Sequence, residues 1–372
     1  MKLKWKIPCV FLIIFAFCTM LFTLSCIFPQ IAGFMNRTLC NAVRISLASI
    51  TSVFPFSVFE IFVIAAPVLL IYVVLFIFRA TSDNIRKRFI SILSVFSFIL
   101  SLYILTLGIS YKAPSVIRMY GDNITKEQII SSAEKLTDYV NEISGNINNL
   151  PHLSELRDEL SDSYAEILFD YGYDMQTFPR PKRVILSRLL SYAGCLALYS
   201  FPTGEVNINA EIPEYTVPFT VAHEYAHVMG ISSERDANFF GFLSCAHSEN
   251  LYIKYSGLLS GLEYLLLDIY TADSSSYNNI YEGLSERARS DMSLYRQYSK
   301  KYSQSFIYRA SDKINSAHLD VWDGCGKDSY SEVSKCIVNY LNHPQSLRIK
   351  CSETTVFWSE KWDDLLYTEA KL

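Results

Sequence analysis

Three long runs of apolar residues without a single charge dominate the first part of the chain. The runs cover residues 7–36, 61–78 and 89–111. Each run is about 18 residues or longer, enough to cross a hydrocarbon core of roughly 30 Å as a helix. The predicted transmembrane helices lie near residues 8–28, 58–78 and 89–110. Residues 1–110 are therefore expected to form a membrane anchor.

A different pattern separates the first two runs. Apolar residues recur every three or four positions from Met35 to Ile50, whereas Asn36, Arg37 and Arg44 fall elsewhere. Such an amphipathic helix is typical of a segment lying in the membrane interface. Docking against the rest of the protein is the favoured role for this helix.

The region after the anchor alternates polar and apolar positions with a mostly helical period. Residues 122–171 follow this helical pattern, and residues 219–341 repeat it over several helices. Between them, two strand candidates and one helix candidate occupy residues 183–187, 205–209 and 188–199. Residues 111–372 are therefore expected to form a mostly helical domain with a small β-sheet. The fold class predicted for the whole chain is a membrane-anchored α+β protein.

Basic residues in the short flanks of the three runs predict the orientation in the membrane. The N-terminus and the second loop hold Lys2, Lys4, Lys6, Arg79, Arg86, Lys87 and Arg88. The first loop holds only Arg37 and Arg44. This bias predicts a multi-pass cell-membrane protein with a cytoplasmic N-terminus. The third helix then carries residues 111–372 to the extracytoplasmic side.

Composition sharpens the division into two parts. Residues 1–110 carry nine basic and two acidic side chains, and residues 111–372 carry 24 basic and 35 acidic ones. With only 19% charged residues and 14% aromatic ones, the chain does not have the composition of a disordered protein. The acidic outer part argues against nucleic-acid binding.

The candidate chemistry lies in the segment VPFTVAHEYAHVMGISSERDANFFGFL, residues 217–243. His223 and His227 are four residues apart, so both imidazoles lie on one face of a helix and can bind one divalent ion. Glu224 is turned about 100° away on the same helix and can reach a water molecule without binding the metal itself. Pro218 suits the first turn of this helix, and Gly230 suits its end.

A third ligand is expected from the helix that follows. Ser233 is a natural N-cap with Asp236 as its capping-box partner, so a second helix should begin directly after the turn. Glu234 then lies in its first turn, where a tight helix-turn-helix could return the carboxylate to the two imidazoles. Asn238, four residues later, could support a ligand by a hydrogen bond. The alternative for Glu234 is a surface acid stabilised by the helix dipole.

Other residues are weaker candidates for the site. His247 could be a ligand, with an ordinary partly buried histidine as the alternative. Tyr255 could stabilise an oxyanion, and so could Tyr225, but the chain has 25 tyrosines. Cys325 and Cys336 could pair in an oxidising compartment.

Several segments together carry a family resemblance. They are FPFSV at residues 54–58, FPTGEVNIN at 201–209, HEYAHVMG at 223–230, SERDANFFGFL at 233–243 and KYSGLL at 254–259. The chain resembles the domain of unknown function 3810 family, bacterial membrane proteins regarded as candidate zinc metallopeptidases. The ExxAN portion is also similar to the third-ligand helix of gluzincin peptidases. However, six residues separate His227 from Glu234, a spacing that resembles that of metzincins more.

The resemblance implies a zincin-like metallopeptidase domain and assigns roles to the site residues. The implied zinc ligands are His223, His227 and Glu234, with Glu224 as the general base and Asn238 as a supporting residue. It also implies that residues 205–209 form an edge strand along which an extended peptide could bind.

The expected function is that of a zinc-dependent metallopeptidase with Zn²⁺ as its cofactor. Glu224 would act as general base toward a water at the open metal position. The expected partners are the lipid bilayer and a peptide or protein substrate from the envelope or membrane, and not nucleic acid. The alternative is a membrane interaction or sensor protein with a structural zinc site, completed by His247. Intramembrane proteolysis is disfavoured because charged residues surround the motif.

Overall fold

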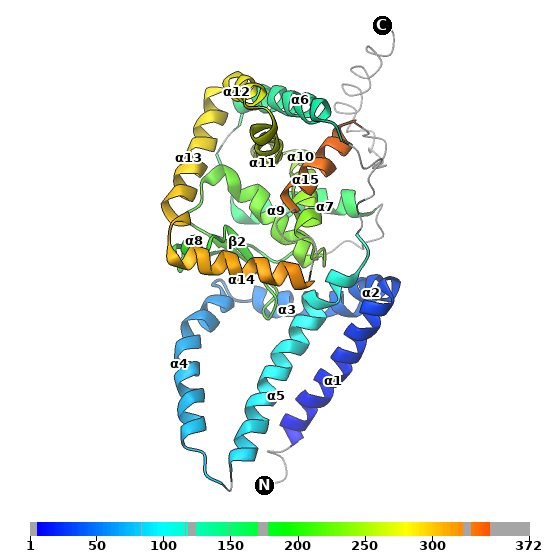
Figure 1. The fold of residues 1–372 in the computed structure, drawn as a ribbon, viewed down its shortest axis with the longest axis vertical. Coiled ribbons are helices and arrows are strands. Elements are labelled where there is room, and N and C mark those ends of the chain that lie inside the picture. Colours follow the sequence, from blue (N-terminus) through cyan, green and yellow to red (C-terminus); the bar gives the residue numbers. More distant parts are fainter. Residues whose placement is uncertain are drawn as a thin grey trace.

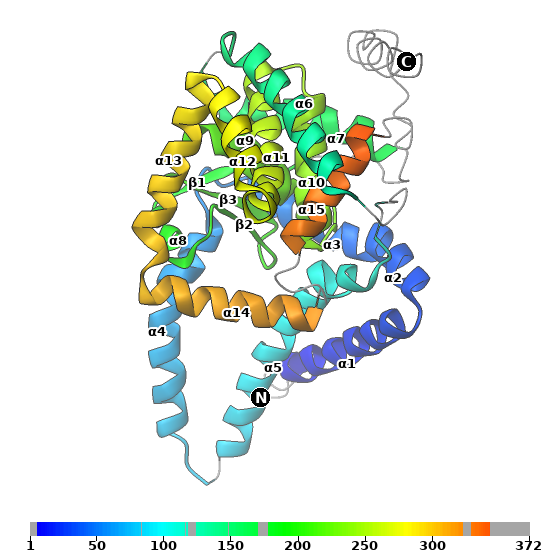
Figure 2. The same cartoon turned by 45° about the horizontal axis from the view of Figure 1, so that its top comes forward.

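The computed structural model describes residues 6–82, 84–115, 117, 124–147, 149–169, 178–322 and 329–342. The described part is mostly helical, with one small sheet. Three long helices extend from one end of the molecule, and the remaining elements form a compact outer domain above them (Figure 1). The outer domain is seen from a second direction in Figure 2.

The three extending helices are the predicted spans. They are α1 (Lys6–Ile27), α4 (Val58–Phe78) and α5 (Ile85–Tyr103). All three are long and apolar enough to cross a membrane, and the third apolar stretch continues from α5 through η3 (Ile104–Gly108) and η4 (Ser110–Lys112). Ser57 caps α4 because its hydroxyl accepts a hydrogen bond from the backbone amide of Glu60. Length and hydropathy therefore agree with the prediction.

A short helical layer lies across the upper ends of the three helices (Figure 1). It consists of α2 (Pro29–Met35), η2 (Asn36–Cys40) and α3 (Asn41–Ser52). The sequence placed Asn36 and Arg44 away from the apolar face, yet both side chains are buried against the outer domain. Docking, the favoured role for this segment, is therefore confirmed by these contacts.

The sheet has three strands in the order β1-β3-β2. Their bounds are β1 (Lys182–Val184), β2 (Ala197–Ser200) and β3 (Glu205–Asn209). Strand β1 runs parallel to β3, and β2 runs antiparallel to it. The expectation that residues 205–209 form an edge strand is wrong, because β3 is central and every one of its residues is buried.

The predicted helix at residues 188–199 is also wrong in its second half. The helix α8 (Ser187–Ala193) ends at Gly194, which has a left-handed φ of 76°. Glycine adopts this conformation without steric cost and therefore ends the helix. The following residues enter the sheet as β2, so that this strand, and not β3, supplies an edge.

The remaining helices build the outer domain. They are α6 (Lys126–Ser144), α7 (Leu153–Phe169), η5 (Glu214–Thr216), α9 (Val217–Val228), α10 (Glu234–His247), α11 (Leu251–Ala272), α12 (Ser274–Gly283), α13 (Glu286–Ser303), α14 (Phe306–Trp322) and α15 (Ser329–Asn342). Helices α9, α10 and α11 pack against one another in the middle of the core. Gly241 allows α10 to approach α9 closely, since an added Cβ would lie 3.2 Å from the backbone nitrogen of His223.

A buried ion pair joins the sheet to the second long helix. The two carboxylate oxygens of Glu205 accept hydrogen bonds from the backbone amides of Val58 and Phe59, at 3.0 and 2.9 Å. Lys182 lies 2.6 Å from the same carboxylate and donates to two carbonyls of residues 51–56. A negative charge at a helix N-terminus is favourable, and at the N-terminus of α4 this charge is the carboxylate of Glu205 from the outer domain. The anchor and the outer domain are therefore interlocked at this junction.

Candidate metal centre

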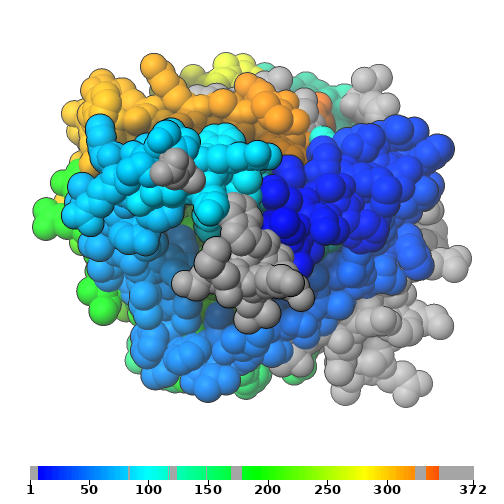
Figure 3. Space-filling view, turned by 90° about the horizontal axis from the view of Figure 1, so that it is seen from below, coloured from blue at the N-terminus to red at the C-terminus, as the bar shows by residue number. Residues whose placement is uncertain are grey.

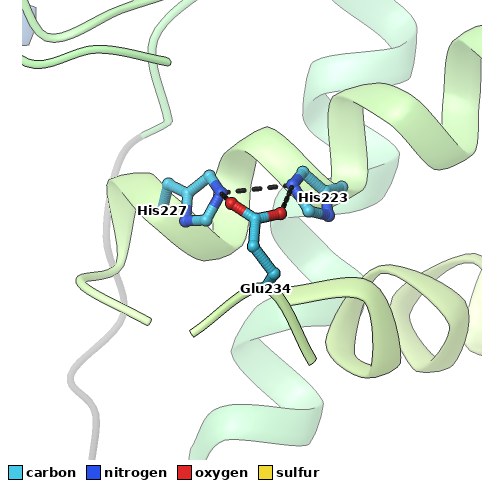
Figure 4. Close-up of side chains that lie close together, drawn as sticks. All are labelled: His223, His227 and Glu234. Atoms are coloured by element: carbon cyan, nitrogen blue, oxygen red, sulfur yellow. Dashed lines mark hydrogen bonds and ion pairs between the residues drawn. The ribbon is translucent and has the colours of Figure 1, made fainter. Parts of the chain in front are cut away.

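The two candidate metal-binding elements form a tight helix-turn-helix, drawn in Figure 4. Pro218 lies in the first turn of α9, where its missing amide costs nothing. Gly230 ends the helix with a left-handed φ of 85°. Helix α10 then begins at Glu234. These local predictions are confirmed.

The cap of α10 differs from the prediction. Ser233 precedes the helix in an extended conformation, but its side chain makes no capping hydrogen bond. Asp236 instead accepts hydrogen bonds from Ser115 at 2.6 Å and from Arg235 at 2.8 Å. The expected capping box is therefore absent, because Asp236 binds the segment that leads out of the long helix bundle.

The turn brings one carboxylate to two imidazoles. Nε2 of His223 and Nε2 of His227 lie 3.1 Å apart. The carboxylate oxygens of Glu234 lie 3.4 Å from the first and 3.6 Å from the second. Three ligand atoms at tetrahedral corners around a zinc ion, each about 2.0–2.1 Å from it, would be separated by about 3.3 Å. The 3.4 Å and 3.6 Å distances belong to different oxygens of Glu234, and one atom from each residue lies within 4.8 Å of the others, so the three side chains can converge on one metal ion.

The Nδ1 atoms of the two histidines have different surroundings. Nδ1 of His227 donates a 2.8 Å hydrogen bond to the carbonyl of Ile231, which fixes the ring with Nε2 toward His223 and Glu234. Nδ1 of His223 is buried and has no hydrogen-bond partner among the described residues. The Asn238 side chain lies close enough to raise the pKa of His223. Asn238 is therefore beside the predicted ligand.

The charges of the cluster are strongly coupled. Burial alone would raise the pKa of Glu234, but the hydrogen bond from His223 and the charges of three histidines hold it at about 2. The third of these histidines is His318 on α14. Burial would lower the pKa of His223, whereas Glu234 raises it. Glu234 is thus held as an anion, the form that binds a metal.

Glu224 faces the same space from α9 without joining the ligand cluster. Its carboxylate accepts a 2.6 Å hydrogen bond from the backbone amide of Tyr199 in β2, and the side chain is buried. Burial raises the pKa of Glu224, and the neighbouring histidines oppose that effect. A carboxylate fixed beside a metal site in this way can accept a proton.

The cluster opens into a cavity of about 670 Å³. Its walls include Leu198 and Tyr199 of β2, Phe219 of α9, and Tyr308 and His318 of α14. A second cavity of about 640 Å³ shares Phe219 with the first and extends between α9, α11 and α13. It is lined mostly by apolar and tyrosine side chains. Both volumes suit small-molecule or peptide side-chain binding.

The last turn of α9 is capped by a residue from the anchor. The Arg44 side chain is only 1% exposed and donates to the carbonyls of Val228 and Met229 at 3.0 and 3.3 Å. Asn36 donates to the carbonyl of Gly230 at 2.9 Å and accepts from Arg44 at 3.0 Å. A positive charge at the end of a helix is favourable. The segment after α1 therefore fixes the turn that carries His227 to Glu234.

Several weaker candidates lie elsewhere. The Tyr255 hydroxyl donates to Asp291 at 2.8 Å, and the Tyr225 hydroxyl donates to the carbonyl of Pro179. His247 shares a 3.0 Å hydrogen bond with Tyr340. None of these three side chains lines the cavity at the metal-binding cluster. Cys336 is buried on α15, and its possible partner Cys325 lies outside the described residues.

Three contributors to the site were missed in the sequence. The sequence predicts Tyr199 in a helix, and it therefore does not predict the hydrogen bond from the Tyr199 backbone amide to Glu224. His318 is 91 positions beyond His227, and Arg44 is 184 positions before Val228. No local spacing connects residues so far apart, and a single sequence provides no other signal for them.

Comparison with known proteins identifies a family for most of the chain. Residues 36–338 match the family model described as a protein of unknown function (DUF3810). Neither the curated proteins nor the solved structures gave a match. The matched region includes η2 and α3, the second and third long helices, and the cluster of His223, His227 and Glu234. The family resemblance is therefore confirmed, and the family description assigns no activity.

Proposed function

This chain belongs to the DUF3810 family, and we propose that it is a zinc-dependent peptidase that hydrolyses peptide bonds of envelope or membrane-associated proteins. One observation carries the proposal. One ligand atom each from His223, His227 and Glu234 can be chosen within 4.8 Å of one another, beside the buried carboxylate of Glu224. Two histidines, one acid and an adjacent base are the residue types of a hydrolytic zinc site.

The residues present suit zinc better than a hard cation. Two imidazoles and one carboxylate form a typical catalytic zinc ligand set, whereas magnesium and calcium prefer oxygen ligands alone. Bound zinc would supply Lewis-acid chemistry, polarising the scissile carbonyl and lowering the pKa of water. His223, His227 and Glu234 would hold it, and Asn238 would support His223.

Glu224 would perform the proton transfers. The Tyr199 amide holds one carboxylate oxygen at 2.6 Å, which leaves the other to accept a proton from the attacking water. The same carboxyl group would then deliver this proton to the amine leaving group. General acid-base catalysis of this kind contributes about 10²- to 10⁴-fold to a rate.

Strand β2 would bind the substrate backbone. It pairs with β3 on one side only, and its residues line the cavity at the metal-binding cluster. The Leu196 carbonyl accepts from Asn209 of β3, so by alternation the backbone groups of Ala197 and the carbonyl of Tyr199 face the open edge, whereas the Tyr199 amide is bound to Glu224. An extended peptide could add to this edge as a further strand. The adjoining tyrosine-lined cavity would then receive a large apolar side chain.

The long helices would place the enzyme in the cell membrane. Three described helices are apolar enough to span it, and the flanking Lys and Arg residues favour a cytoplasmic N-terminus and an extracytoplasmic site. The cluster of His223, His227 and Glu234 lies on α9 and α10 of the outer domain (Figure 1), and the third apolar stretch reaches its cavity with Leu107 and Tyr111 near the end of that stretch. Cleavage outside the bilayer is therefore favoured over intramembrane proteolysis.

A structural zinc site is the second candidate function, for a membrane sensor or interaction protein. Structural zinc is almost always held by four protein ligands. Among the described residues, the metal-binding group contains three, and His247 is paired with Tyr340 instead. The open cavity beside the cluster also favours catalysis.

The zinc content of the purified full chain tests the proposed site. We expect one zinc per wild-type chain. In the Glu234→Gln variant the zinc affinity should fall by more than the 10- to 100-fold loss that is typical when a residue hydrogen-bonded to a metal ligand is replaced. Glu224→Gln is the matched control, because it changes the adjacent acid without removing a ligand. Equal zinc binding by all three proteins would remove Glu234 from the site.

A further inference from the structure

Helix α14 lies across the base of the outer domain, at the level where the long helices enter it (Figure 1). Its C-terminal end is fixed to α1 and α5. The Trp322 ring packs 4.9 Å from the Tyr103 ring and 5.3 Å from the Phe22 ring, measured between centroids. Lys112 also donates a 3.0 Å hydrogen bond to the Trp322 carbonyl.

The N-terminal part of α14 is fixed near α4. The Tyr308 ring lies on Gly194, where an added Cβ would come within 2.8 Å of it. Gly194 ends α8, and the turn before α8 is tied to α4 because the Leu186 amide donates to Glu60 at 2.7 Å. The two ends of α14 are thus held near different long helices, which makes α14 run across the bundle.

One face of α14 is apolar and exposed. Ile307, Ile314 and Val321 are seven residues apart, so they lie along one side of the helix, two turns from each other. Their exposed fractions are 46%, 72% and 70%, and the adjacent Phe306 is 78% exposed. The exposed charged residues Arg309 and Asp312 lie on the opposite side, whereas Lys313 and Asp320 follow Phe306 along the edge of the apolar face. Helices with this pattern bind in the plane of a membrane interface.

Another face of the same helix closes the cavity at the metal-binding cluster. Tyr308, Asn315 and His318 line that cavity from α14. Ile314 also lines its rim while remaining largely exposed, so the cavity borders the apolar face. Seen from the side of the long helices, α14 lies next to α5 (Figure 3). The rim of the cavity therefore adjoins the surface from which the spans extend.

We propose that α14 is an in-plane membrane helix that inserts Phe306, Ile307, Ile314 and Val321 into the leaflet facing the outer domain. Lipid is the occupant because the exposed face continues from three helices that are themselves apolar and exposed. The substrate would then be a membrane-tethered protein cut close to the bilayer surface. This last step rests on the proposed peptidase function, whereas the lipid contact does not.

Photo-crosslinking of the full chain in phosphatidylcholine nanodiscs tests the lipid contact. A benzophenone amino acid is placed singly at Ile307 or Val321, and at Arg309 or Asp312 as matched exposed positions on the opposite side of the helix. We expect on the order of 5-fold more lipid adduct at the two apolar positions, because such faces lie about 5–10 Å inside the interface. Equal adduct at all four positions, or none at Ile307 and Val321, would overturn the proposal.

Cleavage assays then test the substrate class. We expect wild-type protein in nanodiscs to cleave a peptide tethered to the same bilayer on the order of tenfold faster than the free peptide. The triple variant Phe306→Gln, Ile307→Gln, Val321→Gln should lose this preference and keep its rate on the free peptide. A preference unchanged in the variant would contradict the substrate class. Absence of any cleavage would instead count against the peptidase function, and the crosslinks would still decide the lipid contact.

Discussion

Replacing Glu224 by Gln is expected to lower kcat/KM for peptide cleavage by about 10²- to 10⁴-fold without loss of zinc. The amide can still accept the hydrogen bond from Tyr199, so the backbone contact of the side chain is retained. At neutral pH, however, the glutamine amide cannot accept a proton from water. The measurement is cleavage of a fluorogenic peptide library by zinc-loaded full chain.

Glu214→Gln is the matched control for this experiment. Glu214 is an exposed acid in the turn before α9 and lies outside the cavity. The same chemical change there should leave the rate within a few-fold of wild type, because surface substitutions rarely disturb a structure. If the Glu224→Gln protein cleaved peptides as fast as the control, Glu224 would not be the base.

The second large effect is expected at Arg44. Methionine in its place preserves much of the side-chain volume but leaves the carbonyls of Val228 and Met229 without their buried donor. Breaking a buried charged network of this kind costs about 3–5 kcal/mol of unfolding free energy. Because the freed turn connects His227 to Glu234, zinc affinity should also fall, by roughly tenfold.

Thermal unfolding and zinc titration of the full chain in detergent measure both effects. Arg37→Met is the control, since Arg37 is exposed in the same segment. A destabilised Arg44→Met variant with unchanged zinc affinity would show that the cap supports the fold and not the site. If Arg44→Met and Arg37→Met unfolded alike, the junction between anchor and outer domain would have to be reinterpreted.

The parts of the structure predicted correctly are those encoded over short distances. Three uncharged apolar runs predicted the long helices, and the four-residue spacing of His223 and His227 put both imidazoles on one helix face. Gly230 and the adjacent turn predicted that Glu234 would return to them. These features depend on helix geometry and on a single left-handed glycine, and both are readable from neighbouring residues.

The parts that were missed depend on contacts between distant segments. The local sequence around Leu198 and Tyr199 does not distinguish a strand from a continuation of α8. Pairing with β3 in the sheet sets their extended conformation. Strand order is likewise set by the whole domain, which is why β3 was misplaced at an edge. Arg44 was counted as a loop charge for the orientation of the protein, whereas it also caps α9 from within the core. No periodicity reports such a contact.

X-ray absorption at the zinc edge of the full-length chain tests the proposed site most directly. We expect one zinc per chain with two imidazole nitrogens at about 2.0–2.1 Å and only oxygen in the remaining positions. Those oxygens would come from Glu234 and from solvent. A chain that binds no zinc, or a shell with a third imidazole or a sulfur ligand, would contradict a catalytic centre at His223, His227 and Glu234.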